Sequence, residues 1–257
     1  FKSKLYHIYK DPTVKEDINR PAQKEEPLPD LLRNAYRILG RDWEELYKSW
    51  KEQGSVVPPV MITVANRTET AARIKYYFNS KKSGIDLLGD PKYTIHIDSK
   101  TMEVSEESSD IPAYSEEETE GRKLSKKDQE ALLRSIVDTV GQIGKPGEQI
   151  RNVVSVGMLT EGWDAKTVTH IMGLRAFSSQ LLCEQVVGRG LRRTSYDIEE
   201  GTDLFTAEYV NIFGIPFAFL PHESTGTGHP LSTKPKSEAS SPITPPQIAD
   251  NETIGLL

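Results

Sequence analysis

Residues 153–193 constrain the fold more than any other part of this 257-residue chain. Residues 153–156 and 168–172 are two short apolar runs rich in β-branched residues, and a polar loop that contains glycine joins them. Such runs are typical of buried strands. Residues 178–193 then change to a helical period. A buried strand followed by an amphipathic helix predicts an α/β fold with a mostly parallel sheet.

The helix predicted over 178–193 has one polar and one apolar side. Gln185, Arg189 and Arg192 are spaced i, i+4 and i+7, which places them on one face. A guanidinium is a planar fork that matches phosphate oxygens and stays charged at any working pH. We therefore expect this face to hold an anion. Four residues form the apolar side and its edge: Cys183, Val186, Val187 and Leu191.

Two motifs in this stretch resemble those of superfamily 2 helicases and translocases. Residues 185–192 (QVVGRGLR) resemble the sixth motif, Q-x-x-G-R-x-x-R, and residues 161–164 (EGWD), placed after a strand, resemble the fifth. The residues of both motifs are similar to those of the Res subunits of type III restriction enzymes. Each motif supplies the context that the other needs, and the likeness covers roughly residues 58–193.

The resemblance implies that the chain carries the second RecA-like domain of such a motor. We expect a three-layer α/β fold with a central, mostly parallel sheet over 56–193, interrupted by an acidic loop at 102–121. An N-terminal connector with short helices over 1–55 would precede it. A C-terminal β extension over 194–220 and a flexible tail over 221–257, where the chain is truncated, would follow.

The resemblance also implies the catalytic residues. In these motors ATP lies in a cleft between two α/β domains, and the second domain supplies arginines that meet the γ-phosphate. Arg192 would be the arginine finger, with Arg189 as its companion, and Gln185 would orient the γ-phosphate or the attacking water. A finger of this kind contributes about 10³–10⁵-fold to the rate.

Further contacts follow from the same resemblance. Gly162, Asp164 and Gly188 would bind the nucleotide. Asp164 would accept a hydrogen bond from the ribose hydroxyl, and Gly188, having no side chain, would let the helix approach another backbone. Four residues are expected on nucleic acid: Asn66, Arg67, Ser99 and Thr160.

The chain lacks the parts that hold ATP most firmly. Neither a Walker A loop nor a D-E-x-H box occurs in it, and residues 144–147 (GKPG) lack the order G-x-x-x-x-G-K-[ST]. We therefore expect ATP and Mg²⁺ to be bound mainly by a missing first domain, and the chain alone to be inactive. The expected partners are DNA and that first RecA-like domain, with a methyltransferase or specificity subunit as a further candidate. No metal site is predicted within the chain, because the spacing of His96 and His170 favours structural roles.

Periodicity and turn residues predict the remaining elements. The Asn66-x-x-Glu69 spacing is a variant of the capping box that opens a helix. The other expected elements are a short strand at 5–9, helices over 29–40 and 42–54 with Asp42 as a cap, strands over 56–64 and 93–98, a helix over 125–141, and a hairpin or sheet extension around Gly214.

Composition limits the possible settings. The net charge of −6 argues against a broad basic surface, so nucleic acid would be met by a local groove. The single cysteine, Cys183, excludes a disulfide framework, and no run of 18 apolar residues occurs. The simplest interpretation is an intracellular protein of the bacterial cytoplasm with no membrane segment.

Alternatives stay open for both the function and the residues. The chain could be a non-catalytic helicase-like interaction module or an RNA helicase domain, since nothing here reads or excludes a 2′-hydroxyl. Arg189, Arg192 and Arg193 could be a basic helix end that complements the helix dipole. Asp164 could be only a turn residue.

Overall fold

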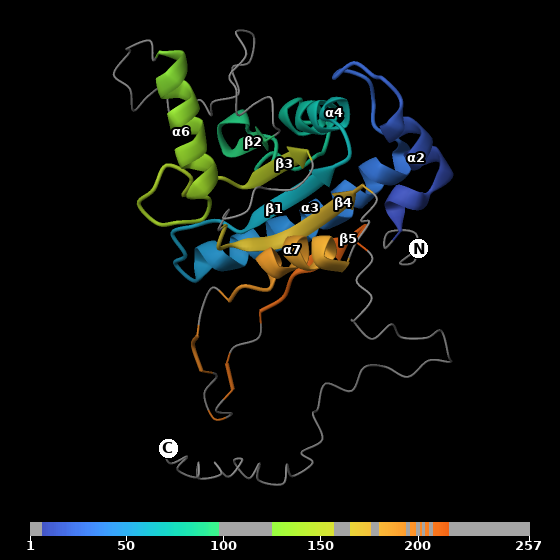
Figure 1. Ribbon diagram of the computed structural model, residues 1–257. Helices are drawn as coiled ribbons and strands as arrows, with labels where there is room; N and C mark the ends of the chain where they lie inside the picture. The colour runs from blue at the N-terminus through green and yellow to red at the C-terminus, as the bar shows by residue number, and fades with distance from the viewer. Residues whose placement is uncertain are drawn as a thin grey trace, which may run out of the picture. The chain divides into compact units, whose positions relative to one another are not determined.

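Five parallel strands form the centre of the molecule (Figure 1). The computed structural model describes residues 7–97, 125–156, 165–175, 180–193, 196–198, 201, 204–205 and 208–215. The strands are β1 (Val60–Ala65), β2 (Thr94–Ile97), β3 (Asn152–Val156), β4 (Val168–Leu174) and β5 (Asn211–Phe213), in the order β2-β3-β1-β4-β5. The predicted α/β fold with a central parallel sheet is confirmed.

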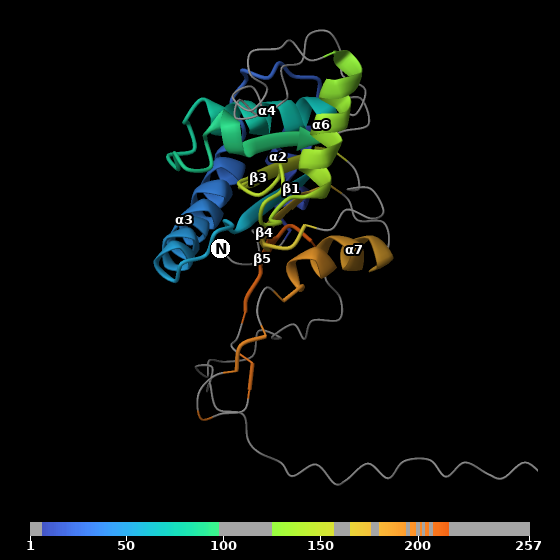
Figure 2. The same cartoon turned by 90° about the vertical axis from the view of Figure 1, so that its left-hand side faces the viewer.

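Helices cover both faces of this sheet and give three layers (Figure 2). The helices are α2 (Pro12–Asn19), α3 (Asp30–Glu52), α4 (Thr68–Asn79), α6 (Lys126–Asp138) and α7 (Gln180–Gly190), with short 3₁₀ turns at Ile8–Lys10 and Pro91–Tyr93. The α2, α3 and α4 helices pack on one face, and α6 and α7 pack on the other. This arrangement is consistent with the expected RecA-like three-layer fold.

The direction of the crossovers explains which helix covers which face. The connection β1–α4–β2 moves along the strand order toward the β2 edge of the sheet. The connections β2–α6–β3 and β4–α7–β5 move in the opposite direction, toward the β5 edge. Crossovers between parallel strands are almost always right-handed. Reversing the direction of travel therefore moves the helix to the opposite face. All six residues of β1 are buried, because both layers cover this central strand.

Residues 30–52 form one helix, α3, and not the two short helices expected from sequence. Gly40 lies inside it, where a Cβ would clash with the Ile85 side chain, so this glycine permits close packing and does not end the helix. Gly54, at φ +81°, follows the end of α3 as predicted. Tyr36 and Trp43 are fully buried, so α3 is part of the layered core.

A buried arginine attaches the N-terminal segment to α4. Arg73 is 1% exposed, and its Nη1 donates to Asp17 Oδ2 at 2.8 Å. The same guanidinium donates to the carbonyl oxygens of Glu26 and Pro27. The short strand expected at 5–9 is wrong over its described part, since Ile8–Lys10 is a 3₁₀ turn.

His170 joins α3 to the sheet. Its Nε2 lies 2.9 Å from Asp42 Oδ2, and its Nδ1 lies 2.8 Å from Thr169 Oγ1. Asn211 of β5 donates to the same Asp42 oxygen. Asp42 therefore connects helix and sheet from the middle of α3, and its expected role as a helix cap is wrong. Burial lowers the pKa of His170, an effect that the hydrogen bond to Asp42 only partly opposes.

The predictions for α6 are confirmed, and of the two alternatives for the last strand the sheet extension is observed. Ser125 caps α6 by accepting from the Asp128 backbone N–H, and Gly141 follows its end at φ +73°. Residues 211–213 form the edge strand of the main sheet, parallel to β4. Gly214, at φ +76°, lies directly after this strand, against the carbonyl of Gly173. In the part of the chain that the structure covers, no helix is long and apolar enough to cross a membrane.

The lowered pKa of His170 predicts a pH-dependent stability. Because the unfolded chain binds this proton more readily than the fold does, the stabilisation is present above about pH 6.5 and is lost as the pH falls below it. We expect urea unfolding between pH 7 and pH 5 to show that the free energy of unfolding decreases as the pH is lowered. His170→Gln should flatten this dependence. Equal slopes in wild type and His170→Gln would contradict the assignment.

Candidate functional site

The carboxyl ends of four strands meet at one edge of the sheet. Ala65 of β1 is paired in register with Val156 of β3 on one side and with Leu174 of β4 on the other. Ile97 of β2 pairs with Ser155 of β3. The segments that follow β1, β2, β3 and β4 therefore begin side by side. Ligands of open parallel sheets bind outside this edge, so we name it the carboxyl-edge site, with residues 65–67, 97, 156 and 174–175 at its base.

The strand order reverses between β1 and β4. The chain leaves β1 toward α4 on one face and leaves β4 toward α7 on the opposite face. Connections that separate in this way open a crevice at the sheet edge. Asn66 and Arg67 follow β1 at this point, and Arg175 follows β4. The structure thus places two of the predicted nucleic-acid residues at the topological switch point.

Four predicted site residues lie outside the described part of the chain: Ser99, Thr160, Gly162 and Asp164. Their segments start at two positions of the carboxyl-edge site. Ser99 follows β2, and the other three follow β3, which pairs with β2 and with β1. Their contacts stay predictions.

Asn66 and Arg67 fasten the β1–α4 loop to the end of α2. Asn66 Nδ2 donates to the Ile18 carbonyl oxygen and to Asn19 Oδ1, both at 3.0 Å. Arg67 donates to the Asn19 carbonyl oxygen, and its Nη2 lies 3.1 Å from Glu69 Oε1. The expected capping by Asn66 is wrong, because Arg67 occupies the N-cap position without a side-chain cap and α2 engages the Asn66 amide. Both residues are held in place, which favours a defined surface at the switch point.

The apolar side of α7 packs onto the sheet. Cys183, Val186 and Val187 are buried in the core that α6 and α7 share with the strands. Leu191 was expected on the same side, but it is 59% exposed, because the helix ends at Gly190. The apolar pattern is therefore confirmed only over the helix itself.

The predicted catalytic residues differ in their surroundings. Gln185 and Arg189 are half-buried, and they lie one turn apart on α7. Burial lowers the pKa of the Arg189 guanidinium, which still stays charged at neutral pH. Arg192 follows the end of the helix and is exposed. Gln185 and Arg189 thus share a helix face, whereas Arg192 belongs to the turn beyond it.

The structure separates the arginines of α7 from the switch point. α7 starts after the carboxyl end of β4, and its last residue, Gly190, packs beside Val210, directly before β5. The helix therefore leads away from the carboxyl edge. Arg189 and Arg192 lie apart from Asn66 and Arg67, so the candidate site has two surfaces.

The lack of a side chain permits close packing at Gly190, whereas Gly188 has no close neighbour in the described structure. A Cβ at Gly190 would clash with the Val210 side chain and would lie 3.3 Å from Ile171 Cδ1. A Cβ at Gly188 would meet nothing within 4 Å in the described structure. The expected close backbone approach at Gly188 is therefore not made within this part of the chain. An approach by another domain stays a prediction.

Arg193 contacts an aromatic pair that the sequence pattern did not reveal. Its guanidinium lies 5.0 Å from the Phe205 ring centre and 5.9 Å from that of Tyr196. The two rings meet edge to face at 5.8 Å, and both are more than half exposed. Ile198 and Phe205 form an antiparallel bridge that brings the segment back on itself. The spacing of Tyr196 and Phe205 in the sequence gives no signal that Arg193 is their partner.

Comparisons with protein-family models, with curated proteins and with solved structures find no match to this chain. Within the residues covered by the structure, no group of three or more His, Cys, Asp or Glu side chains could hold a metal ion. The site's own residues are amides and guanidiniums, which are suited to binding anions.

The two glycines of α7 give a matched test of this packing. Gly190→Ala is expected to lower the free energy of unfolding by about 1–2 kcal/mol, because the new Cβ overpacks against Val210. Gly188→Ala should raise it by up to about 1 kcal/mol, because alanine favours the helix and meets open space. Urea unfolding of both variants measures the difference. The same sign for both variants would show that α7 does not pack in this way.

Proposed function

We propose that this chain is the second RecA-like motor domain of an ATP-dependent DNA helicase or translocase, of the kind found in Res subunits of type III restriction systems. One observation carries the proposal: the two helicase-like motifs follow two strands of the same parallel sheet, and a single strand lies between these two. Residues 161–164 come after β3, residues 185–192 start within α7 after β4, and β1 alone separates these two strands. A RecA-like domain requires this placement.

The arginines would act on ATP held by another domain. Arg192 is exposed, so its guanidinium can reach a γ-phosphate across a closing interface. Arg189 is half-buried, and a guanidinium with less competing water attracts phosphate more strongly. Gln185, one turn earlier, would orient the γ-phosphate or the attacking water. Mg²⁺ bound with ATP would neutralise charge that develops during phosphoryl transfer.

The carboxyl-edge site would face nucleic acid and the nucleotide sugar. Asn66 and Arg67 are anchored at the switch point, and the segments that carry Ser99 and Thr160 begin beside them. Here Asp164 would accept a hydrogen bond from the ribose and Gly162 would allow close approach, whereas Gly188 lies on α7 with the arginines. Two separate surfaces fit a motor domain, which must contact nucleotide and nucleic acid at once.

The parent protein would supply what this chain lacks. A first RecA-like domain would bring the phosphate-binding lysine and the Mg²⁺ carboxylate. DNA would be the track, a methyltransferase or specificity subunit would be a further partner, and the bacterial cytoplasm would be the setting. The net charge of −6 makes DNA contacts local, at the carboxyl edge.

A non-catalytic interaction module is the second candidate. It is favoured by the apolar residues that follow α7, since Tyr196 is 72% exposed and Tyr209 is 80% exposed. Exposed aromatic residues of this kind are common at protein interfaces. The module would hold partner subunits without hydrolysing ATP.

The test is DNA-stimulated ATP hydrolysis by a protein that contains this chain together with a phosphate-binding domain. Arg192→Ala is expected to reduce kcat about 100-fold or more with ATP still bound, because the finger acts on the transition state. The control is Arg134→Ala, an exposed arginine of α6 on the same side of the sheet. Equal loss in both variants, or none in Arg192→Ala, would rule out the finger. If no variant hydrolyses ATP with any DNA, the interaction module is the better account.

A further inference from the structure

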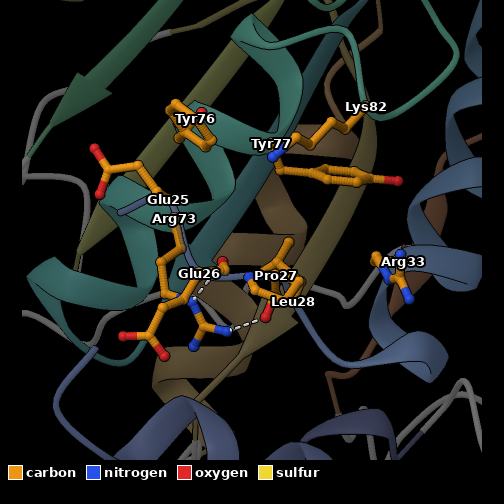
Figure 3. Close-up of a pocket in the computed structure, with 9 residues that line it drawn as sticks. All are labelled: Glu25, Glu26, Pro27, Leu28, Arg33, Arg73, Tyr76, Tyr77 and Lys82. Atoms are coloured by element: carbon orange, nitrogen blue, oxygen red, sulfur yellow. Dashed lines mark hydrogen bonds between the residues drawn. The ribbon is translucent and has the colours of Figure 1, made fainter. Parts of the chain in front are cut away.

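We propose that a pocket between α3, α4 and residues 25–28 binds a small aromatic anion, a single ring that carries a carboxylate or a phosphate (Figure 3). The pocket lies on the α3 and α4 side of the sheet, opposite α7. It is therefore separate from the arginines of the motor proposal and does not depend on that proposal.

The size and walls of the pocket suit one ring. Its volume is about 230 Å³, larger than the roughly 150 Å³ cavity that holds benzene in a protein core. Pro27 and Leu28 line it from the irregular segment before α3, and Tyr76 and Tyr77 line it from α4. Flat aromatic and apolar surfaces favour a planar ligand body.

Two buried donors at the pocket call for an acceptor. Tyr77 is 4% exposed, and its hydroxyl makes no hydrogen bond of good geometry with the described residues, although the Arg37 side chain lies close enough to interact with it. Arg33 Nε likewise makes no hydrogen bond with the described residues, while the Nη2 of that arginine contacts the exposed Asp30. In Figure 3 the Tyr77 hydroxyl and the Arg33 side chain lie toward the same end of the pocket. Buried polar groups are normally satisfied, so a ligand oxygen at this end would complete both.

The protonation state of Tyr77 agrees with a donor role. Burial raises the pKa of Tyr77, and the nearby Arg37 and Arg33 oppose this only in part. The hydroxyl therefore keeps its proton at neutral pH and can donate to a carboxylate or phosphate oxygen. Hydrogen bonds to a charged acceptor are the stronger kind.

The charges at the pocket also favour an anion. Arg73 is satisfied by Asp17 and by backbone oxygens, and Glu26 pairs with Arg20 at 2.7 Å. Lys82 makes no ion pair with a described residue, and its Nζ lies 4.9 Å from the Tyr76 ring centre. The carboxylates of Glu25 and Glu26 point away from the Arg33 end in Figure 3. Arg33 and Lys82 are thus the cations left available at the pocket, with Lys82 beside the Tyr76 ring.

The turn before Lys82 has an unusual backbone. Lys81 adopts φ +59°, the left-handed region that side chains other than glycine rarely occupy. Its N–H donates to the Phe78 carbonyl oxygen and so closes the end of α4. Such conformations persist where the surroundings fix them, and this one sets the direction in which Lys82 leaves the helix.

The experiment titrates the purified chain with benzoate, phenyl phosphate and benzamidine, using calorimetry and thermal unfolding. Benzoate or phenyl phosphate is expected to bind and to raise Tm, whereas benzamidine, a cation of the same size, is not. Tighter binding of phenyl phosphate assigns a phosphate ligand, and tighter binding of benzoate assigns a carboxylate. Absence of binding by both anions below about 10 mM, or equal binding of benzamidine, overturns the proposal.

Variants locate the binding. Tyr77→Phe should weaken anion binding about tenfold, since it removes one hydrogen bond to a charged group. It should leave the Tm of the unliganded chain nearly unchanged, because the deleted hydroxyl makes no hydrogen bond of good geometry in the fold. Lys82→Gln should also weaken binding, and the control Arg41→Gln, an exposed arginine of α3 outside the pocket, should not. Wild-type affinity in both Tyr77→Phe and Lys82→Gln would place the anion elsewhere.

Discussion

The parallel pairing of β1 with β3 and β4 is the constraint on which the rest of the structure depends. A parallel neighbour requires a crossover, and right-handed crossovers leave one face for α4 and the other for α6 and α7. Burial on both faces then demands apolar strands, as the six buried residues of β1 show. The same pairing brings the carboxyl ends of four strands to one edge. Fold and candidate site therefore follow from one set of backbone hydrogen bonds.

Polar contacts complete the layers that apolar packing begins. Arg73 joins α4 to α2 and to the segment before α3, and His170 with Asp42 joins α3 to β4 and β5. Each is a buried group whose loss would leave a partner unsatisfied, so these contacts specify how the N-terminal helices dock. They also explain why α2 and α3 belong to the same core as the strands. A polar anchor at Asn66 extends this docking to the switch point.

The sequence predicts local patterns well and distant partners poorly. The strands at 153–156 and 168–172 and the helix at 126–138 were found because their apolar period is local. Gly40 was wrongly predicted to end a helix. A glycine is needed there because the Ile85 side chain, 45 residues later in the sequence, packs against it. The sequence left a hairpin and a sheet extension open for β5, because its partner β4 lies some 40 residues earlier. Gly190 was passed over in favour of Gly188, since Val210 decides that contact, and the pocket at Tyr77 gave no sequence signal.

The central claim is that Arg192 acts on the γ-phosphate during its transfer, and trapping of a transition-state analogue tests it most directly. The measurement is retention of ADP with aluminium fluoride, in the presence of DNA, by a protein that contains this chain and its phosphate-binding domain. We expect wild type to trap the analogue and Arg192→Ala to bind ATP with unchanged affinity but to lose the trapped complex. Equal trapping by both proteins would contradict the claim and would leave Arg192 as a basic residue beyond a helix end.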